Sequence, residues 1–456
     1  MKLIKYFKNI YSVFVDINLA SLVKNSSWLF MAQVTNVGLA VIQSIVVARL
    51  LGVEKYGLLA LITVYVTVVN QLFDCRISET VVKYVSEFLA DEDRPRIWAT
   101  IKFCYLVDLS TGILAFALIT LTAHLAAAYI IHKPEVGGLI TLYALTLLFS
   151  TVNGTCLGVL TVFRRFSWLS FYTVSAEFIR VVLVVLFLLI DYGIRGIIVS
   201  YIISSFMASG IVLYLAIKVI RSSVRQDRVQ GKISLLKEKL GGMFKFILNT
   251  NLHESLNLFT RNIDVMILGY FRGSTEVGYY RLAKTFVSGF ELISGPFYTA
   301  IYPQLSMMWS AHKIGEFKGF IKRVTGFMVI LAAPIALAFF ILVPYLIKYV
   351  VGTEFMHTAD PARIMLFGIF IAMIFVWVRP AFLSMGRPGT LTLINLFNAA
   401  IMFALSLFIV PRFGYIGSAI MYIYPYFAIH GIAIFIFLRN IRRYSISDDF
   451  AAGMRG

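Results

Sequence analysis

The sequence predicts an all-α integral membrane protein, with about 12 transmembrane helices in two parallel six-helix lobes around a central cavity. Three observations support this fold class: an apolar composition, apolar stretches of helical length along the whole chain, and an internal repeat. The chain has 456 residues, of which 59% are hydrophobic and 14% are charged. Soluble domains carry about 25% charged residues, so the composition excludes a soluble fold.

Apolar stretches of about 20 residues, long enough to cross the hydrocarbon core as α-helices, recur along the chain. Backbone polar groups in lipid must be satisfied within their own segment, so each stretch is expected to be helical. The predicted spans are 27–51, 56–75, 101–130, 138–161, 169–190, 196–219, 243–270, 278–302, 324–350, 361–384, 389–410 and 415–438. The seventh and eighth spans are the least hydrophobic.

The net charge of +18 is explained by membrane topology and does not indicate binding of nucleic acid. Most of the 41 Lys and Arg residues fall on one side of the predicted helices. That side is predicted to be cytoplasmic and to hold both termini. The basic residues on the outer loops and helix ends are Arg49, Lys55, Lys133, Arg195, Arg272, Lys348, Arg363 and Arg412.

These patterns divide the chain into five predicted parts. They are an amphipathic cytoplasmic N-terminal segment (1–25), an N-terminal six-helix lobe (26–220), a cytoplasmic linker (221–242), a C-terminal six-helix lobe (243–439) and a cytoplasmic tail (440–456). The basic linker is expected to set topology, although binding of lipid headgroups is also compatible with its charge.

An internal repeat relates the two halves. The turn from Gly52 to Gly57 follows the first span, and the turn from Gly273 to Gly278 follows the seventh span at an offset of 221 residues. At the same offset, the turn at Gly193 falls on the turn at Gly414. A shift by six helices restores the orientation in the membrane, so the halves are predicted to be parallel copies suited to alternating access.

Polar side chains inside the predicted spans lie on single helical faces. The seventh span carries Glu254, Asn257, Arg261 and Asp264, and the eighth carries Arg281, Lys284, Ser288 and Glu291. Steps of three and four residues keep each set on one face. The repeat places Gln33, Asn36 and Gln43 of the first span in a milder version of the same stripe. Because charges in lipid are costly, these faces are expected to line one aqueous cavity between the halves.

Two interpretations of these charges remain open. In the first, Arg261, Arg281 and Lys284 are unpaired positive groups that bind an anion. In the second, Arg261 with Asp264, and Glu177 with Arg180 on the fifth span, are ion pairs that only hold the bundle together.

Neither a metal site, nor a cofactor, nor nucleotide hydrolysis is expected. His253-Glu254 lacks the second histidine of a zinc helix because Asn257 stands at that position. Cys75, Cys104 and Cys156 have no metal or disulfide spacing and are interpreted as packing residues. No phosphate-binding loop of the ATPase type is present, so active transport would use an ion gradient or a substrate gradient.

Several motifs resemble those of a known family. The run Ala48-Arg-Leu-Leu-Gly52-Val-Glu-Lys-Tyr-Gly57, followed by Ser86-Glu-Phe-Leu-Ala-Asp91, resembles the opening of polysaccharide and O-antigen flippases. In the second half, Asn262-Ile-Asp264-Val-Met-Ile-Leu-Gly269 and Val277-Gly278-Tyr-Tyr-Arg-Leu-Ala283 are similar to the start of their second lobe, and Tyr302-Pro-Gln-Leu-Ser306 to the end of its second helix. The superfamily is that of multidrug, oligosaccharidyl-lipid and polysaccharide exporters.

The resemblance implies a flippase that is not an enzyme and that moves a polyprenyl-pyrophosphate-linked oligosaccharide across a prokaryotic cytoplasmic membrane. It implies inward-open and outward-open states and a substrate that enters sideways. Membrane lipids and polysaccharide polymerase or assembly proteins are the expected partners. The candidate substrate-binding residues are Arg261, Arg281, Lys284, Asn257, Asn36 and Gln33. The candidates for coupling to H⁺ or Na⁺, or for charge pairing, are Asp264, Glu254, Glu291, Glu177 and Arg180.

Two alternatives belong to other functional classes. A multidrug or metabolite cation antiporter of the same fold would be expected to have a mainly acidic cavity, whereas this stripe contains two arginines and a lysine that suit pyrophosphate oxygens. A glycan polymerase or ligase would be expected to carry catalytic residues on a large outer loop. The longest predicted outer connection, near 350–361, is too short for that.

Overall fold

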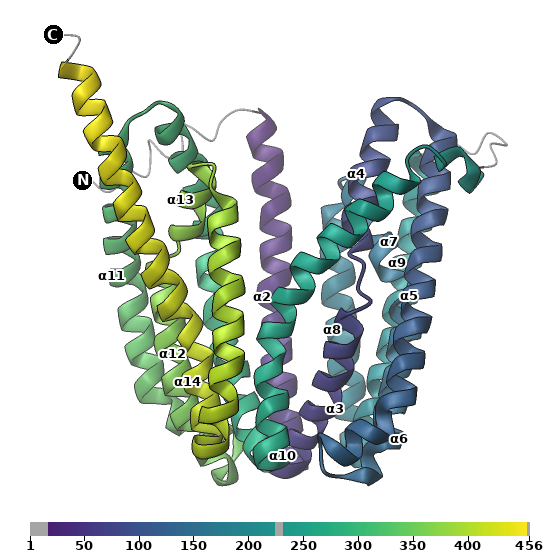
Figure 1. Cartoon of the computed structure of the whole chain (residues 1–456). Coiled ribbons are helices and arrows are strands. Elements are labelled where there is room, and N and C mark those ends of the chain that lie inside the picture. Colours follow the sequence, from purple (N-terminus) through teal and green to yellow (C-terminus); the bar gives the residue numbers. More distant parts are fainter. Residues whose placement is uncertain (1–16, 224–230, 454–456) are drawn as a thin grey trace. The chain divides into compact units, whose positions relative to one another are not determined.

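The computed structural model describes residues 17–223 and 231–453, and every regular element in these ranges is a helix (Figure 1). The side chains at 17–26, 249–261 and 442–453, and those at a few single positions such as 291, are outside the described set. In the predicted N-terminal segment 1–25 and the tail 440–456, the structure therefore describes the helical backbone of 17–25 and 440–453 but almost no side chain.

The first half of the chain contains eight α-helices and one short 3₁₀-helix before the linker. Their bounds are α2 Ile17–Leu51, α3 Val53–Gln71, α4 Ile77–Ala90, α5 Arg94–Tyr129, η1 Pro134–Val136, α6 Gly137–Ser150, α7 Asn153–Val162, α8 Phe166–Leu189 and α9 Gly193–Ser223. Helix α4 was not among the predicted spans because its 14 residues are too few to cross a bilayer.

The second half begins after a short 3₁₀-helix in the linker and contains two very long helices. The bounds are η2 Ile233–Leu236, α10 Leu240–Ser310, α11 Ile314–Leu346, η3 Ile347–Val351, η4 Thr353–Thr358, α12 Ala359–Ile374, α13 Val378–Ser384 and α14 Pro388–Gly453. Both α10 and α14 are two helices joined through a non-helical glycine, at Gly273 and Gly414 respectively.

Nine helical stretches within the described residues are long and apolar enough to cross a membrane. They are Ser27–Leu51, Val53–Gln71, Arg94–Tyr129, Pro134–Val162, Phe166–Leu189, Gly193–Ser223, Ile314–Val351, Thr353–Ser384 and Gly389–Arg439. The last one contains the break at Gly414, and α10 supplies two further helices on either side of Gly273. The structure thus confirms an all-α membrane fold with about twelve long helical passes.

The glycines of the internal repeat adopt matching backbone conformations. Gly52 and Gly273 have φ angles of 77° and 81°, and Gly193 and Gly414 have φ angles of 55° and 56°. This left-handed region is readily open only to glycine, and each of the four residues joins two helices. The members of each pair are 221 residues apart. The repeat predicted from two turns is therefore present in the backbone.

Two more glycines of the repeat make reciprocal contacts. A Cβ atom on Gly57 would meet the carbonyl oxygen of Ser274, and a Cβ atom on Gly278 would meet the carbonyl oxygen of Val53. The repeat makes Gly57 equivalent to Gly278 and Val53 equivalent to Ser274. The start of α3 and the corresponding part of α10 therefore pack backbone against backbone, in two copies of one contact.

The fourth and tenth predicted spans are each broken into two helices, which the sequence did not predict. The first break separates α6 from α7 at 151–152, and the second separates α12 from α13 at 375–377. At the first break, Asp108 of α5 accepts hydrogen bonds from the backbone N–H of Thr155 (2.8 Å) and from its hydroxyl (2.6 Å). A side chain from another helix thus satisfies a free donor at the start of α7.

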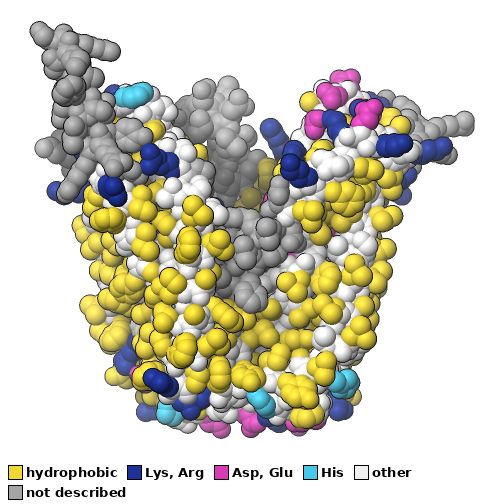
Figure 2. Space-filling model, in the orientation of Figure 1, with side chains coloured by type: hydrophobic (Ala, Val, Ile, Leu, Met, Phe, Trp, Pro, Cys, Tyr) yellow, Lys and Arg dark blue, Asp and Glu magenta, His cyan; other side chains and the backbone are white. Residues whose placement is uncertain are grey.

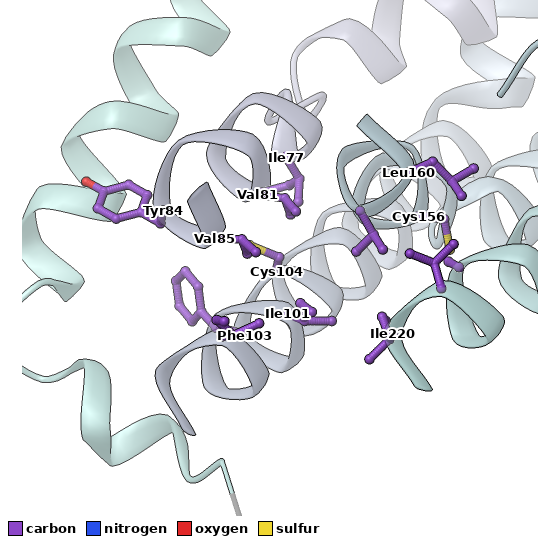
Figure 3. Close-up of a cluster of buried hydrophobic side chains, with 14 of the residues drawn as sticks. Ile77, Val81, Tyr84, Val85, Ile101, Phe103, Cys104, Cys156, Leu160 and Ile220 are labelled. Atoms are coloured by element: carbon purple, nitrogen blue, oxygen red, sulfur yellow. The ribbon is translucent and has the colours of Figure 1, made fainter. Parts of the chain in front are cut away.

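The described contacts divide the chain into two compact units. The first comprises Met1–Gln43, Val69–Ala123 and Gly138–Ser255, and the second comprises Ser44–Val68, His124–Gly137 and Leu256–Gly456. Figure 3 shows the core of the first unit, where α4, α5, α7 and α9 meet. The buried residues labelled there are Ile77, Val81, Tyr84, Val85, Ile101, Phe103, Cys104, Cys156, Leu160 and Ile220. Helical spacing along α4 places its apolar side chains on the face toward this core.

The described part of the linker packs against the first unit. The ammonium group of Lys102 donates a hydrogen bond to the carbonyl oxygen of Gly231 (3.2 Å), and Lys239 forms an ion pair with Glu87 of α4. Leu236 of η2 is buried in the same core. These contacts hold residues 231–239 against α4 and α5. The segment 224–230 lies outside the described residues.

The core of the second unit is rich in aromatic rings. Phe437 of α14 lies with its ring centroid 5.0 Å from that of Trp377 and 6.2 Å from that of Phe317. Offset and edge contacts at such distances stabilise aromatic clusters beyond simple burial. Around the helices, Figure 2 shows hydrophobic side chains along their length and Lys, Arg, Asp and Glu gathered at their ends. This distribution is the one expected for helices surrounded by lipid.

Candidate functional site

The structure places the predicted site residues on three helices. Gln33 and Asn36 lie on α2, Glu177 and Arg180 lie on α8, and the remaining residues lie on α10. Gln33 is exposed, whereas Asn36 is half-buried and its side-chain oxygen has no hydrogen-bond partner among the described residues. The side chains of Glu254, Asn257, Arg261 and Glu291 lie outside the described set.

Asp264 is the centre of a polar cluster in the second unit, the Asp264 cluster, which also contains Tyr280, Lys284 and Tyr422. The Lys284 ammonium nitrogen lies 2.7 Å from Asp264 Oδ2, and the Tyr280 hydroxyl donates a hydrogen bond to the same oxygen. The backbone N–H of Val265 donates to Asp264 Oδ1 at 2.8 Å. The ammonium nitrogen also lies 5.5 Å from the ring centroid of Tyr422 on α14.

Burial makes these contacts necessary for the Asp264 carboxylate. The side chain of Asp264 is 4% exposed and that of Lys284 is 17% exposed. A buried charge is tolerated when it is paired and its lone pairs are satisfied, and both carboxylate oxygens of Asp264 accept hydrogen bonds. Lys284, an unpaired positive group in one of the two interpretations of the sequence, therefore has a carboxylate partner.

The pairing follows from the turn at Gly273. Asp264 precedes this glycine and Lys284 follows it, so the two residues belong to consecutive helices and meet where those helices pack. The spacing of three residues between Arg261 and Asp264 predicts a pair within one helix, and this pair stays a prediction because the Arg261 side chain lies outside the described set. Spacing along a helix is informative only for residues of that helix, and it cannot identify a partner beyond a turn.

Arg281 is a cation of a different kind. It lies one helical turn before Lys284 on α10 and is half-buried. In the described part of the chain, its guanidinium group has no ion pair, hydrogen bond or ring contact. An unpaired guanidinium on a membrane-embedded helix is costly unless it faces water or a ligand. Its planar donors suit phosphate or carboxylate oxygens.

A second polar cluster, the Glu177 cluster, lies in the first unit and comprises Gln43, Tyr143, Glu177, Arg180 and Tyr201. Glu177 and Arg180 form an ion pair within α8. The guanidinium carbon of Arg180 lies 6.0 Å from the ring centroid of Tyr201 on α9. The Gln43 side chain of α2 donates a hydrogen bond to the Tyr201 hydroxyl at 2.9 Å. The ring of Tyr143 on α6 lies 5.9 Å from that of Tyr201.

The internal repeat relates the two clusters. Gln43 is equivalent to Asp264 and Tyr201 is equivalent to Tyr422 at the offset of 221 residues. In each half, therefore, a polar residue of the first helix and a tyrosine of the sixth helix belong to one cluster with a cation. The cation comes from the fifth helix in the first half (Arg180) and from the second helix in the second half. The sequence analysis did not identify the two tyrosines, although their shared offset could have shown them.

The described residues contain no group of three or more His, Cys, Asp or Glu side chains placed to hold a metal ion. The chemistry of the two clusters is that of ion pairs, amides and phenols. Such groups bind charged or hydroxyl-bearing ligands by hydrogen bonds and Coulomb attraction.

Solved structures of transporters have a similar fold. A multidrug resistance MATE family transporter in an inward-facing conformation superposes with a TM-score of 0.71 at 13% identity, covering 90% of this chain and 95% of the other. The lipid II flippase MurJ in an inward closed conformation superposes with a TM-score of 0.70 at 15% identity, covering 92% of this chain and 90% of the other. At these identities the likeness concerns the fold.

Sequence comparison gives the family. An uncharacterized membrane protein of Methanocaldococcus jannaschii is 20% identical over 366 residues, which cover 77% of this chain and 71% of the relative. The sequence model of the family described as "Polysaccharide biosynthesis protein" matches residues 22–309, more than half of the chain. The protein that carries these two clusters is thus a member of the polysaccharide biosynthesis protein family.

Proposed function

We propose that this protein translocates a polyprenyl-pyrophosphate-linked oligosaccharide from the cytoplasmic to the outer leaflet of a prokaryotic cytoplasmic membrane, with both termini in the cytoplasm. The family membership supports a role in polysaccharide biosynthesis, and the fold is one that a lipid II flippase shares. The translocated glycan would serve polymerase or assembly proteins at the cell surface as their substrate. The protein acts as a transporter and carries out no covalent chemistry.

The guanidinium of Arg281, which has no partner among the described residues, is the observation that carries this proposal. A pyrophosphate linkage bears negative charge that must be neutralised inside the membrane, and arginine binds its oxygens in a bidentate fashion. Lys284 lies on the same face of α10, one turn further on. The two groups provide positive charge beyond what Asp264 neutralises. Arg261 is proposed to contribute from the preceding helix, with Asn257, Asn36 and Gln33 as uncharged contacts.

Coupling to H⁺ or Na⁺ is proposed to involve Asp264. Its carboxylate is held by a cation and a phenol, so exchange of one partner for an ion would change the packing between the two helices joined at Gly273. Glu254 and Glu291 belong to the same stripe and are proposed as further coupling groups. Alternating access of two related halves is the mechanism that such internal repeats serve.

Replacement of Arg281 tests the proposal. In proteoliposomes loaded with a fluorescent polyprenyl-pyrophosphate-linked glycan, Arg281→Ala should lower the rate of translocation more than tenfold. A charge-assisted hydrogen bond contributes about 1.5 to 3 kcal/mol, which corresponds to this loss. Arg281→Lys should restore only part of the rate, because the planar donor geometry is missing.

The matched control is Arg323→Ala, which removes an exposed arginine of α11 and should leave the rate unchanged. Equal rates for wild type and Arg281→Ala, with both proteins correctly inserted, would contradict the assignment of Arg281 to pyrophosphate binding.

A cation antiporter is the second candidate, because the MATE transporter superposes as well as the flippase does. The two functions differ in the charge of the cargo. If purified protein in vesicles moves organic cations and leaves the lipid-linked glycan in place, the antiporter is the correct assignment.

A further inference from the structure

We infer that the Glu177 cluster binds hydroxyl groups of the saccharide, as a neutral-polyol subsite separate from the cations of α10. The inference rests on the proposed function, because it assumes that the cargo carries a glycan. It assigns recognition of the saccharide to the first unit. Neither the Glu177–Arg180 ion pair nor the internal repeat is by itself evidence for this role.

Hydrogen-bonding capacity left over in the cluster is the first observation. Three buried atoms have no hydrogen-bond partner among the residues that the structure describes: Gln43 Oε1, Glu177 Oε1 and Arg180 Nε. Gln43 is 7% exposed, so its free oxygen is well buried. Leaving such atoms unsatisfied is unfavourable, and buried polar atoms in native proteins normally have partners. A ligand that supplied these partners would recover that free energy.

The mixture of atom types selects the chemistry of the ligand. Gln43 Oε1 and Glu177 Oε1 accept hydrogen bonds, whereas Arg180 Nε donates one. An anion would be repelled by the two oxygens, and a metal or organic cation would be opposed by the guanidinium group. A hydroxyl group both donates and accepts, so the hydroxyl groups of a saccharide match all three atoms. The net charge of the Glu177–Arg180 pair is zero, which also favours a neutral ligand.

Geometry adds an apolar surface and a fixed orientation. The Gln43 amide nitrogen donates a hydrogen bond to the Tyr201 hydroxyl. This bond fixes the amide group, so its oxygen points away from Tyr201. The rings of Tyr143 and Tyr201 form an edge contact with an interplanar angle of 61° beside the polar atoms. Aromatic faces next to hydrogen-bonding groups suit the apolar C–H faces of sugars. The side chain of Arg180 is 40% exposed, so a ligand can reach it.

Two variants remove a free acceptor of the cluster while keeping side-chain volume. Gln43→Met removes the free acceptor and the bond to Tyr201. In Glu177→Gln, the amide oxygen is expected to keep the hydrogen bond from Arg180. The amide NH₂ group, which is a donor, then stands in the place of the free acceptor Glu177 Oε1. Full-length protein in nanodiscs is titrated with two probes, bare polyprenyl pyrophosphate and polyprenyl pyrophosphate carrying a neutral disaccharide. Each variant should weaken binding of the disaccharide probe about fivefold, the equivalent of one hydrogen bond, and leave binding of the bare probe unchanged.

Asn398→Leu is the matched control. Asn398 occupies the position equivalent to Glu177 in the second half and is also buried with an unpartnered oxygen, as far as the described residues show. It lines an apolar cavity of about 340 Å³ with Leu393, Phe397 and Ile401. This variant should not change the preference for the disaccharide probe. The monodispersity and melting temperature of each variant are measured alongside, so that loss of folding is recognised.

The outcomes separate the inference from the proposed function. Wild-type protein that binds neither probe would contradict the proposed function and the inference with it. Wild-type protein that binds both probes equally, or variants that weaken both probes by the same factor, would overturn the saccharide subsite alone. A selective loss for the disaccharide probe in both folded variants would establish it.

Discussion

At the scale of single residues, Asp264 has three hydrogen-bond donors among the described residues, and they come from different parts of α10. Two of them, Tyr280 and Lys284, lie beyond the turn at Gly273, and one is the next backbone N–H. A buried ion pair adds little net stability compared with an apolar pair, but loss of one partner leaves a buried charge alone. The pair is therefore expected to be far more sensitive to single than to double substitution.

A double-mutant cycle tests this expectation. Asp264→Asn and Lys284→Met should each lower the free energy of unfolding by about 3 to 5 kcal/mol, because each leaves one charge uncompensated. The double variant should recover most of this loss. Thermal and denaturant unfolding in detergent provide the measurement. Additive losses in the double variant would show that the two side chains do not interact in the folded protein.

Transport by the same double variant separates stability from substrate binding. Recovery of stability without recovery of glycan translocation would indicate that the pair also acts in transport, through contact of Lys284 with the anionic headgroup or through ion coupling at Asp264. Recovery of both would leave the pair as a purely structural contact between consecutive helices.

At the scale of helices, the turns are what sequence patterns predict well. Gly52, Gly193, Gly273 and Gly414 were aligned by spacing alone, and all four adopt the left-handed conformation. At these four turns the positive φ is recorded locally in the sequence as glycine, although other turns of the chain place residues such as Asp191 at positive φ. The breaks at 151–152 and 375–377 carry no such local record. At the first break, the backbone N–H of Thr155 donates to Asp108 of another helix. Hydrophobic periodicity along the chain cannot reveal a partner on another helix.

The same limit explains what could be predicted of the clusters. The stripe on α10 correctly marked Asp264 and Lys284 as unsuited to lipid, because helical periodicity reports which face a residue occupies. The pairing of Asp264 with Lys284 depends on how two helices pack after a turn. The positions of Tyr201 and Tyr422 beside the two clusters depend on packing between distant segments. Such partners are set by tertiary contacts that lie outside any sequence window.

The reciprocal glycine contacts yield a prediction at this scale. Gly57→Ala and Gly278→Ala should each destabilise the protein, because the added methyl group meets a backbone carbonyl oxygen that cannot rotate away. Overpacking of this kind costs about 1 to 3 kcal/mol. The control is Gly38→Ala on α2, where a Cβ atom would meet no described atom within 4 Å. Melting temperatures in detergent should fall for the first two variants and not for the third.

If all three variants melt together with the wild type, the backbones at Val53 and Ser274 can separate to admit a methyl group. The close contact at these glycines would then be dispensable for stability.

At the scale of the whole molecule, the distribution of Lys and Arg predicts the orientation in the membrane. The loops assigned to the cytoplasm carry most of the basic residues, and this bias orients membrane proteins. The linker is one such loop, and its described residues from 231 onward pack on α4 and α5 of the first unit. The connection around η4 belongs to the side assigned to the exterior.

Cysteine labelling tests this orientation. In a background with Cys75→Ser, Ser234→Cys in the linker should react with a membrane-impermeant maleimide only after the cytoplasmic face is opened. Thr353→Cys should react in intact cells. Both positions are exposed, so access depends on the side of the membrane. Labelling of Ser234→Cys in intact cells would place the linker outside and reverse the assignment of every loop.

The paired contacts of Gly57 with Ser274 and of Gly278 with Val53 have a consequence for ancestry. A contact in which residue i touches j while the equivalent of i touches the equivalent of j is isologous, as in a two-fold symmetric homodimer. A gene duplication that fused two copies of a six-helix dimer would leave this arrangement inside one chain. The two copies are no longer identical, because a Cβ atom would approach the facing carbonyl oxygen more closely at Gly57 than at Gly278. Gly57→Ala should therefore lower the melting temperature more than Gly278→Ala, and equal losses would mean that the backbone relaxes to the same extent at both copies.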